Sequence, residues 1–137
     1  MKKTQLIGIV IVLISLLVVV PAWANGDFEV EIDIKPLSCP SSINPKSRGK
    51  IPVAIITTDV FDATTVDPAS VMFTNSLASP VRWAYEDFDG DGDIDLVLKF
   101  KTQECELPEE DGFLYIYGYL LDGTTTFIGD DWVNIVQ

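Results

Sequence analysis

The chain has no histidine among its 137 residues. Nucleophilic catalysis by a Ser-His-Asp or Cys-His arrangement is therefore excluded, and no serine or cysteine lies in a nucleophile-elbow motif. The lack of histidine also leaves no Cys/His spacing of a zinc site. A pair of carboxylates acting as acid and base on a glycan is the catalytic mechanism that remains. We expect a protein that is not an enzyme, with a glycan-active hydrolase as the less favoured alternative.

Basic residues are scarce, because nine lysines and arginines stand against 21 aspartates and glutamates. Two of the nine, Lys2 and Lys3, lie in an N-terminal leader, so residues 25–137 carry 7 basic and 21 acidic side chains and a net charge of −14. Nucleic acid and anionic membranes are poor partners for such a chain, and cations are natural ones. For the one basic cluster in the sequence, Lys46, Arg48 and Lys50, a solvated turn is favoured over an anion site.

Long hydrophobic runs are absent except for Leu6–Val20, which has 15 residues where roughly 20 are needed to cross a bilayer. The run follows two lysines, is broken by Pro21 and is followed by an Ala-Trp-Ala cleavage pattern. These features predict a signal peptide over residues 1–24, with an uncleaved anchor as the alternative. We therefore expect a secreted or cell-surface protein with no stable membrane span after cleavage, in which residues 25–137 form a single domain.

Cysteine is limited to Cys39 and Cys105. In an oxidising compartment the two could pair, and closing a loop of about 65 residues would stabilise the fold by roughly 4 kcal/mol in the chain-entropy model. We favour this disulfide over two separate thiols.

Helical periodicity is also missing, and alternating or short apolar runs take its place. In 28–34, for example, apolar and acidic residues alternate strictly, which is typical of a half-buried strand. Asp62 and Asp67 each begin a turn with a residue that caps a helical turn, and one short helical turn is expected in this stretch. Asp122-Gly123 predicts a hairpin turn. The expected strands are 28–34, 51–56, 71–74, 81–86, 94–100, 113–121, 124–128 and 132–136. About eight strands indicate an all-β fold, an immunoglobulin-like β-sandwich.

The most informative stretch is the acidic loop between two of these strands, with the spacing D-x-D-x-D-G-x-x-D from Asp87 to Asp95. Calcium takes six to eight oxygen ligands at flexible distances, which aspartates on alternate residues can supply. Leu98 occupies the position where an EF-hand has a bidentate glutamate, so the loop is not an EF-hand. An acidic turn without metal is the less favoured alternative. The predicted calcium ligands are Asp87, Asp89, Asp91, Asp93 through its backbone carbonyl, and Asp95 directly or through water.

The loop resembles the calcium loops set in β-hairpins of FG-GAP repeats in integrin-like propellers. A wider resemblance, to a β-rich module of exported bacterial and archaeal proteins, covers most of residues 25–137. It is carried by the segments Ile32-Asp33-Ile34-Lys35-Pro36, Ser42-Ile43-Asn44-Pro45-Lys46-Ser47-Arg48-Gly49, Ile51-Pro52-Val53-Ala54-Ile55, 61–69 and 89–96. The resemblance implies an extracellular module.

Aromatic residues fall on one face of the expected strand 113–121. That face carries Phe113, Tyr115, Tyr117 and Tyr119, and the opposite face is also apolar, so one of the two must be partly exposed or covered. A buried tyrosine face is favoured; an exposed one would bind carbohydrate or protein, with Trp83 and Trp132 as further candidates. The leading expectation is a secreted calcium-binding β-sandwich with a structural, adhesion or cell-surface role. An extracellular protein or polysaccharide is the partner in the alternative.

Overall fold

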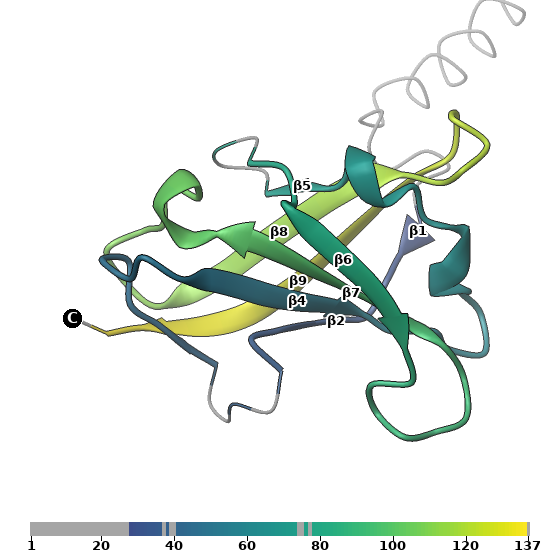
Figure 1. The fold of residues 1–137 in the computed structure, drawn as a ribbon, viewed down its shortest axis with the longest axis horizontal. Coiled ribbons are helices and arrows are strands. Elements are labelled where there is room, and N and C mark those ends of the chain that lie inside the picture. Colours follow the sequence, from purple (N-terminus) through teal and green to yellow (C-terminus); the bar gives the residue numbers. More distant parts are fainter. Residues whose placement is uncertain (1–27, 37, 39–40, 74–75, 77, 137) are drawn as a thin grey trace, which may run out of the picture.

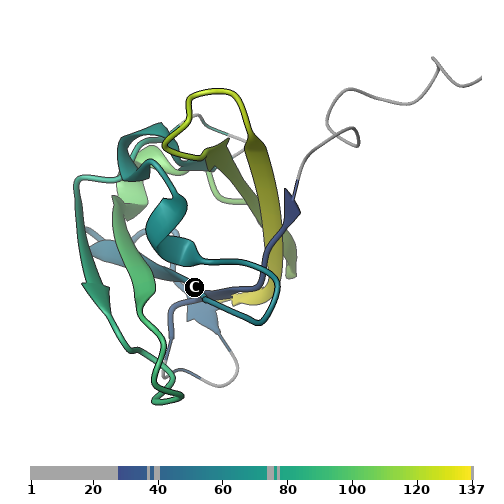
Figure 2. The same cartoon turned by 90° about the vertical axis from the view of Figure 1, so that its right-hand side faces the viewer.

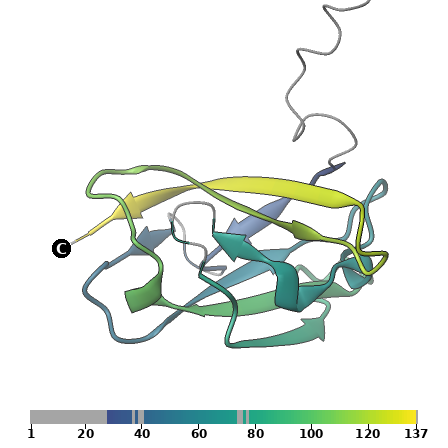
Figure 3. The same cartoon turned by 90° about the horizontal axis from the view of Figure 1, so that it is seen from above.

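The computed structural model describes residues 28–136 except 37, 39–40, 74–75 and 77. The expected signal peptide lies outside these residues. Over the described part the chain forms nine strands and three short 3-10 helical turns, arranged as two facing sheets (Figures 1, 2 and 3). The predicted all-β sandwich is therefore confirmed, while its immunoglobulin-like type stays a prediction. No helix within the described residues is both long and apolar enough to cross a membrane.

The first sheet has the strand order β1-β9-β8-β5, with β3 also pairing with β9. Its long strands β8 and β9 are antiparallel, whereas β1 and β3 run parallel to β9. The strands are β1 (Phe28–Glu29), β3 (Ser42–Ile43), β5 (Met72–Phe73), β8 (Gly112–Tyr119) and β9 (Thr126–Ile135).

The second sheet is fully antiparallel, with the order β2-β4-β7-β6. Its strands are β2 (Ile32–Ile34), β4 (Lys50–Ile55), β6 (Arg82–Glu86) and β7 (Asp95–Lys101). The helical turns are η3 (Ala63–Thr65), η4 (Pro68–Ser70) and η5 (Thr102–Glu104). One short helical turn was expected between residues 62 and 70, and two form there, η3 and η4. Asp62 accepts a hydrogen bond from the Thr64 amide at 2.9 Å, and Pro68 occupies the first helical position.

Two strand predictions were wrong in their boundaries. The segment 28–34 is not one strand, because β1 pairs with β9 in the first sheet and β2 pairs with β4 in the second. The crossing residues bond to both sheets: the Val30 amide donates to Ile128 O at 2.9 Å, and the Ile56 amide donates to Glu31 O at 2.9 Å. The backbone therefore stays hydrogen-bonded, as buried backbone groups must, while the chain passes from one sheet to the other. Because the chain stays extended there, the alternation of apolar and acidic residues in the sequence does not reveal the crossing.

The expected strands 124–128 and 132–136 form one continuous strand, β9. Gly129, Asp130 and Asp131, which lie between the two predicted strands, resemble a turn in sequence but are part of β9. The Asp131 carboxylate accepts a hydrogen bond from the Ile34 amide at 2.9 Å, which joins the first sheet to β2 of the second. Gly129 lies where the chain crosses between the sheets, and a Cβ there would come within 2.7 Å of Ile32.

The core lies between the sheets and is built from alternate residues of the strands. Phe73 and Phe100 meet edge to face across the two sheets, with ring centroids 4.7 Å apart. Other fully buried side chains include Ile34, Val53, Ile55, Leu96 and Leu98 from the second sheet and Ile116, Phe127 and Val133 from the first.

Cys105 is a free, buried thiol at the end of η5, and its Sγ donates to the Lys101 carbonyl at 3.2 Å. The predicted disulfide stays a prediction, because its other cysteine, Cys39, lies outside the described residues. The Cys105 thiol packs in the core cluster beside its own helical turn. Burial, and to a lesser degree the charge of Glu104, raises the pKa of the Cys105 thiol to about 11.

Candidate functional site

The acidic loop connects the antiparallel neighbours β6 and β7, whose last and first residues, Glu86 and Asp95, are directly paired. It therefore joins two strands, as the sequence predicted, and lies at the lower right of Figure 1. The strands fix both ends of the loop, so its carboxylates are held within a short hairpin.

The loop backbone folds around the carboxylate of Asp87. One of its oxygens accepts from the amides of Gly90 at 2.9 Å and Asp91 at 3.2 Å, and the other accepts from the amide of Gly92 at 2.9 Å. Gly90 and Gly92 adopt φ values of +74° and +97°, a region that side chains rarely enter. The two glycines thus allow three amides to point at one carboxylate.

Asp95 closes the loop from the buried side, with no exposed surface. Its Oδ1 accepts from the Thr57 amide at 2.8 Å and its Oδ2 from the Phe88 amide at 2.9 Å. The Thr57 hydroxyl in turn donates to Ile94 O at 2.5 Å and accepts from the Ala63 amide at 2.9 Å. Sequence reasoning missed Thr57, because no local spacing links it to a loop 38 positions away.

Three of the five predicted ligands come together. Carboxylate oxygens of Asp87, Asp89 and Asp95 lie within 4.8 Å of one another, which makes a candidate metal-binding group. The other two predicted ligands do not join this group: Asp91 accepts a hydrogen bond from the Asp93 amide at 2.9 Å instead. Their role as ligands stays a prediction.

The electrostatics of this group favour a bound cation. The pKa of Asp89 is raised by desolvation, by a hydrogen bond with the Asp91 side chain and by the charge of Asp95. A carboxylate has about four acceptor positions, and the hydrogen bonds described above use three on Asp87 and two on Asp95. Acceptor positions are therefore left on all three carboxylates, and a cation placed among them would offset their mutual repulsion.

A second feature is the outer face of β8, where the favoured expectation of a buried tyrosine face is wrong. The exposed fractions are 54% for Phe113, 40% for Tyr115 and 42% for Tyr119, whereas Leu114 is 3% exposed and Ile116 is fully buried. Tyr117 is half-buried. The physical reason is that Leu114, Ile116 and Gly118 face the second sheet; a Cβ on Gly118 would meet the Phe127 ring at 3.0 Å.

Trp132 on β9 extends this exposed surface, since it is directly paired with Phe113 and 48% exposed. The two rings meet edge to face with centroids 5.2 Å apart. Trp83 belongs to the other sheet and does not take part. We call Phe113, Tyr115, Tyr117, Tyr119 and Trp132 the aromatic face.

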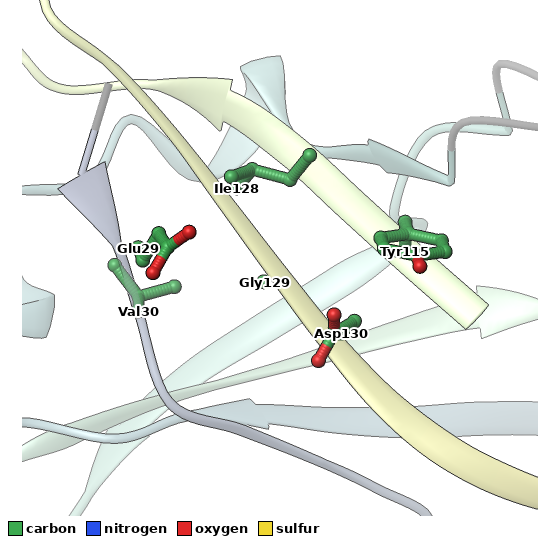
Figure 4. Close-up of a pocket in the computed structure, with 6 residues that line it drawn as sticks. All are labelled: Glu29, Val30, Tyr115, Ile128, Gly129 and Asp130. Carbon is green, nitrogen blue, oxygen red and sulfur yellow. The ribbon is translucent and has the colours of Figure 1, made fainter. Parts of the chain in front are cut away.

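A cavity of about 360 Å³ opens beside the aromatic face (Figure 4). Tyr115 on β8 and Glu29 on β1 lie on either side of β9, and Asp130 on β9 is directly paired with Tyr115. The remaining lining residues are Val30, Ile128 and Gly129. The cavity therefore combines one aromatic ring with two carboxylates that can accept hydrogen bonds.

Comparison with protein-family models, with curated proteins and with solved structures finds no match. The resemblances to FG-GAP calcium loops and to a module of exported proteins therefore remain predictions. Function has to be inferred from the residues themselves.

Proposed function

We propose that this protein is an extracellular calcium-binding β-sandwich module with a structural, adhesion or cell-surface role and no enzymatic activity. The observation that supports it most is the convergence of the Asp87, Asp89 and Asp95 carboxylates within 4.8 Å in a hairpin loop. The loop is already folded around Asp87 and Asp95 by backbone hydrogen bonds, so binding would require little reorganisation.

Calcium is the metal that suits this donor set. The loop offers only oxygen atoms, and the chain has no histidine, so zinc and copper would lack the nitrogen ligands they prefer. Magnesium requires a near-ideal octahedron, whereas calcium tolerates the irregular shell of an exposed loop and takes water for the remaining positions. Asp91 and Asp93 would complete the shell or raise its negative charge.

Thermal unfolding with and without metal tests this proposal. A ligand that binds only the folded state stabilises it by about 2.7 kcal/mol at a hundredfold excess over its Kd, which is a shift in Tm of about 10 °C for a domain of this size. We expect a chelator to lower Tm, and calcium to restore it better than magnesium. An unchanged melting curve in chelator contradicts the proposal.

Asp89→Asn is the informative variant. The asparagine keeps the Oδ1 atom that accepts the Asp91 amide at 3.4 Å, so the loop fold is retained while one negative charge is lost. The variant should melt like the metal-free wild type and gain little from calcium. Asp59→Asn, at an exposed position outside the loop, is the matched control and should keep the full calcium response.

A second candidate function is carbohydrate binding through the aromatic face. Exposed apolar patches on soluble domains mark interaction sites, and aromatic rings with a polar neighbour suit the apolar faces and hydroxyl groups of a sugar. Glu29 and Asp130 beside Tyr115 would accept hydrogen bonds from those hydroxyls. This function would not depend on the metal.

Binding to neutral glucans, measured by affinity electrophoresis, tests the second candidate. Tyr115→Ala and Trp132→Ala should each weaken retardation, whereas Tyr85→Ala, which removes an equally exposed ring from the other sheet, should leave it unchanged. The same glucans test the hydrolase alternative: incubation with the protein should release no reducing ends. Retardation that is lost equally in all three variants would argue against the aromatic face.

A further inference from the structure

All seven basic residues of the described chain gather at or next to one end of the second sheet. The fold brings together positions that are up to 66 residues apart in sequence. None of them lies in a strand of the first sheet. The set, here called the basic end, is Lys35, Lys46, Arg48, Lys50, Arg82, Lys99 and Lys101.

Strand register places four of these side chains next to one another on the outer face of the sheet. Lys50 is directly paired with Lys101, and Arg82 with Lys99. Their neighbours Ile51, Leu98 and Phe100 point into the core, so the basic side chains point outward. Like charges at directly paired positions destabilise a sheet, and here two such pairs lie side by side on adjoining strands.

The turn before β4 is held against the same end. The Gln103 side chain donates to the carbonyls of Ser47 at 2.8 Å and Lys46 at 3.4 Å, and the Thr102 amide donates to Gly49 O at 3.1 Å. These contacts fix the turn carrying Lys46 and Arg48 beside the end of β7. The basic cluster seen in sequence is thus part of a larger one that only the fold assembles.

A small cavity of about 80 Å³ lies between Lys35 and Lys50. Its other polar lining residues are Asn44, Ser47 and Thr102. The Lys35 ammonium donates to the Ser42 carbonyl at 2.5 Å and keeps two further N–H donors. With Lys50 and the hydroxyl and amide neighbours, it makes the cavity suitable for a single anionic group, such as a carboxylate or a sulfate. Lys50 lines this cavity and is also paired with Lys101 on the outer face of the sheet. The cavity and the row of basic side chains are therefore continuous.

The acidic loop lies at the opposite end of the same sheet (Figure 1). Asp95 and Lys101 are the two ends of β7, about 20 Å apart at ~3.3 Å per residue. That distance exceeds the Debye length of about 8 Å at physiological ionic strength. The basic end can therefore attract an anion locally although acidic residues are in threefold excess over residues 25–137. The acidic side chains nearest to it in sequence are Asp33 and Glu104, and Glu86 at the other end of β6 lines the same cavity as Arg82 and Lys99.

We propose that the basic end binds an acidic polysaccharide, with a carboxylate or sulfate group in the cavity between Lys35 and Lys50 and further groups along Lys99, Lys101 and Arg82. Charge density favours this partner over nucleic acid. Duplex DNA carries one charge per about 1.7 Å, so its many phosphates would also face the acidic remainder of the chain. A polysaccharide with one anionic group per sugar or fewer can match a local patch. This proposal does not rest on calcium binding or on the aromatic face.

Calorimetric titration with polygalacturonate tests the proposal, with dextran as the uncharged control polymer. Binding should be saturable, absent with dextran, and weaker by about tenfold or more when salt is raised from about 50 to about 200 mM, because counterions are released. It should persist in chelator and in the Asp89→Asn variant, which separates its failure from failure of the calcium proposal.

The decisive variant is Lys99→Gln with Lys101→Gln, which should weaken polygalacturonate binding at least tenfold. Its thermal melt should match or exceed that of the wild type, because like-charge pairs are removed. Val60→Glu with Leu121→Glu lowers the net charge by the same two units at exposed positions outside the basic end, and should bind almost as well as wild type. Equal loss in both double variants would overturn the proposal.

Two further results would overturn it. The first is tighter binding of a single-stranded oligonucleotide than of polygalacturonate at the same salt. The second is salt-dependent self-association in sedimentation velocity that the lysine variant abolishes, which would mean that the basic end receives the acidic loop of another copy.

Discussion

Oδ1 of Asp95 accepts a hydrogen bond of 2.8 Å from the backbone amide of Thr57, which ties the end of the acidic loop to the segment that follows β4. Oδ2 accepts a second one from the Phe88 amide. Asp95→Ala would leave both amides without their partner, at a cost of about 1–3 kcal/mol each. We expect the free energy of unfolding to fall by about 2–6 kcal/mol, measured by urea denaturation in chelator so that metal binding does not contribute.

Asp95→Asn is the control for this prediction. The asparagine keeps one acceptor oxygen and presents an NH₂ group to the other amide, so it should lose less stability than the alanine variant. If alanine and asparagine are both within ~0.5 kcal/mol of wild type, the range of ordinary surface substitutions, Asp95 does not anchor the loop.

The role of Asp95 also illustrates what the sequence could and could not predict. The spacing of aspartates and glycines in the loop is local, and it correctly indicated a turn between two strands. The partner Thr57 is distant in sequence and was not predictable from spacing. The same holds for the basic end, where the pairs Lys50–Lys101 and Arg82–Lys99 exist only through strand register.

The strand predictions succeeded in β4 and β7, although both strands also bury residues of their outer face, such as Ala54 and Val97. For residues 113–121 the strand was predicted but the buried face was wrong, because both faces are apolar and periodicity cannot say which one packs inside. Which face of β8 is buried depends on close packing at Gly118. The strand predictions failed at residues 30–31, where the chain changes sheet without losing its hydrogen bonds.

Gly129 permits the chain to cross between the sheets, and Gly129→Ala tests this. The added Cβ would lie 2.7 Å from Ile32 Cγ2 and 3.1 Å from Val30 O, so backbone or a branched core side chain must move. Overpacking of this kind costs about 1–3 kcal/mol, which urea denaturation will measure. Gly112→Ala is the matched control, because nothing lies within 4 Å of its Cβ position. Equal stability of the two variants would show that the contact at Gly129 is easily relieved.

Asp122 organises the hairpin turn between β8 and β9 and should titrate at unusually low pH. Hydrogen bonds from the Thr125 hydroxyl and amide, and from the Thr124 amide, lower the pKa of Asp122 to about 2. A depressed pKa contributes stability that is present above the unfolded value of about 3.9 and is lost as pH falls through about 2. An NMR titration should therefore show the amide shifts of Thr124 and Thr125 changing with a midpoint near 2.

Thr125→Val separates the hydroxyl from the amides in this turn. It removes the hydroxyl donor, which has the largest effect on the pKa of Asp122, and keeps both backbone donors. The midpoint should rise toward the ordinary aspartate value of about 3.9 without reaching it. A midpoint unchanged by this substitution would mean that the amides alone hold the carboxylate ionised.

Cys105 should react slowly as long as the protein is folded. Burial raises the pKa of its thiol to about 11, whereas an unfolded cysteine has a pKa of about 8.5, so at pH 8 the reactive thiolate is about two hundredfold rarer in the folded state. In Cys39→Ser, alkylation by iodoacetamide at pH 8 should therefore be at least that much slower without urea than with it. The stability gained from the neutral thiol is complete below about pH 8.5 and declines as pH rises toward 11.

Alkylation of the wild-type protein with iodoacetamide tests whether Cys39 and Cys105 are paired. Unfolded in urea without reductant, the protein should take up two alkyl groups if Cys105 is the free thiol described here. Uptake of none until a reductant is added would mean that Cys39 and Cys105 form a disulfide after all. Removing that disulfide would then lower the free energy of unfolding by about 2–5 kcal/mol, whereas Cys39→Ser should have little effect on stability if the thiols are free.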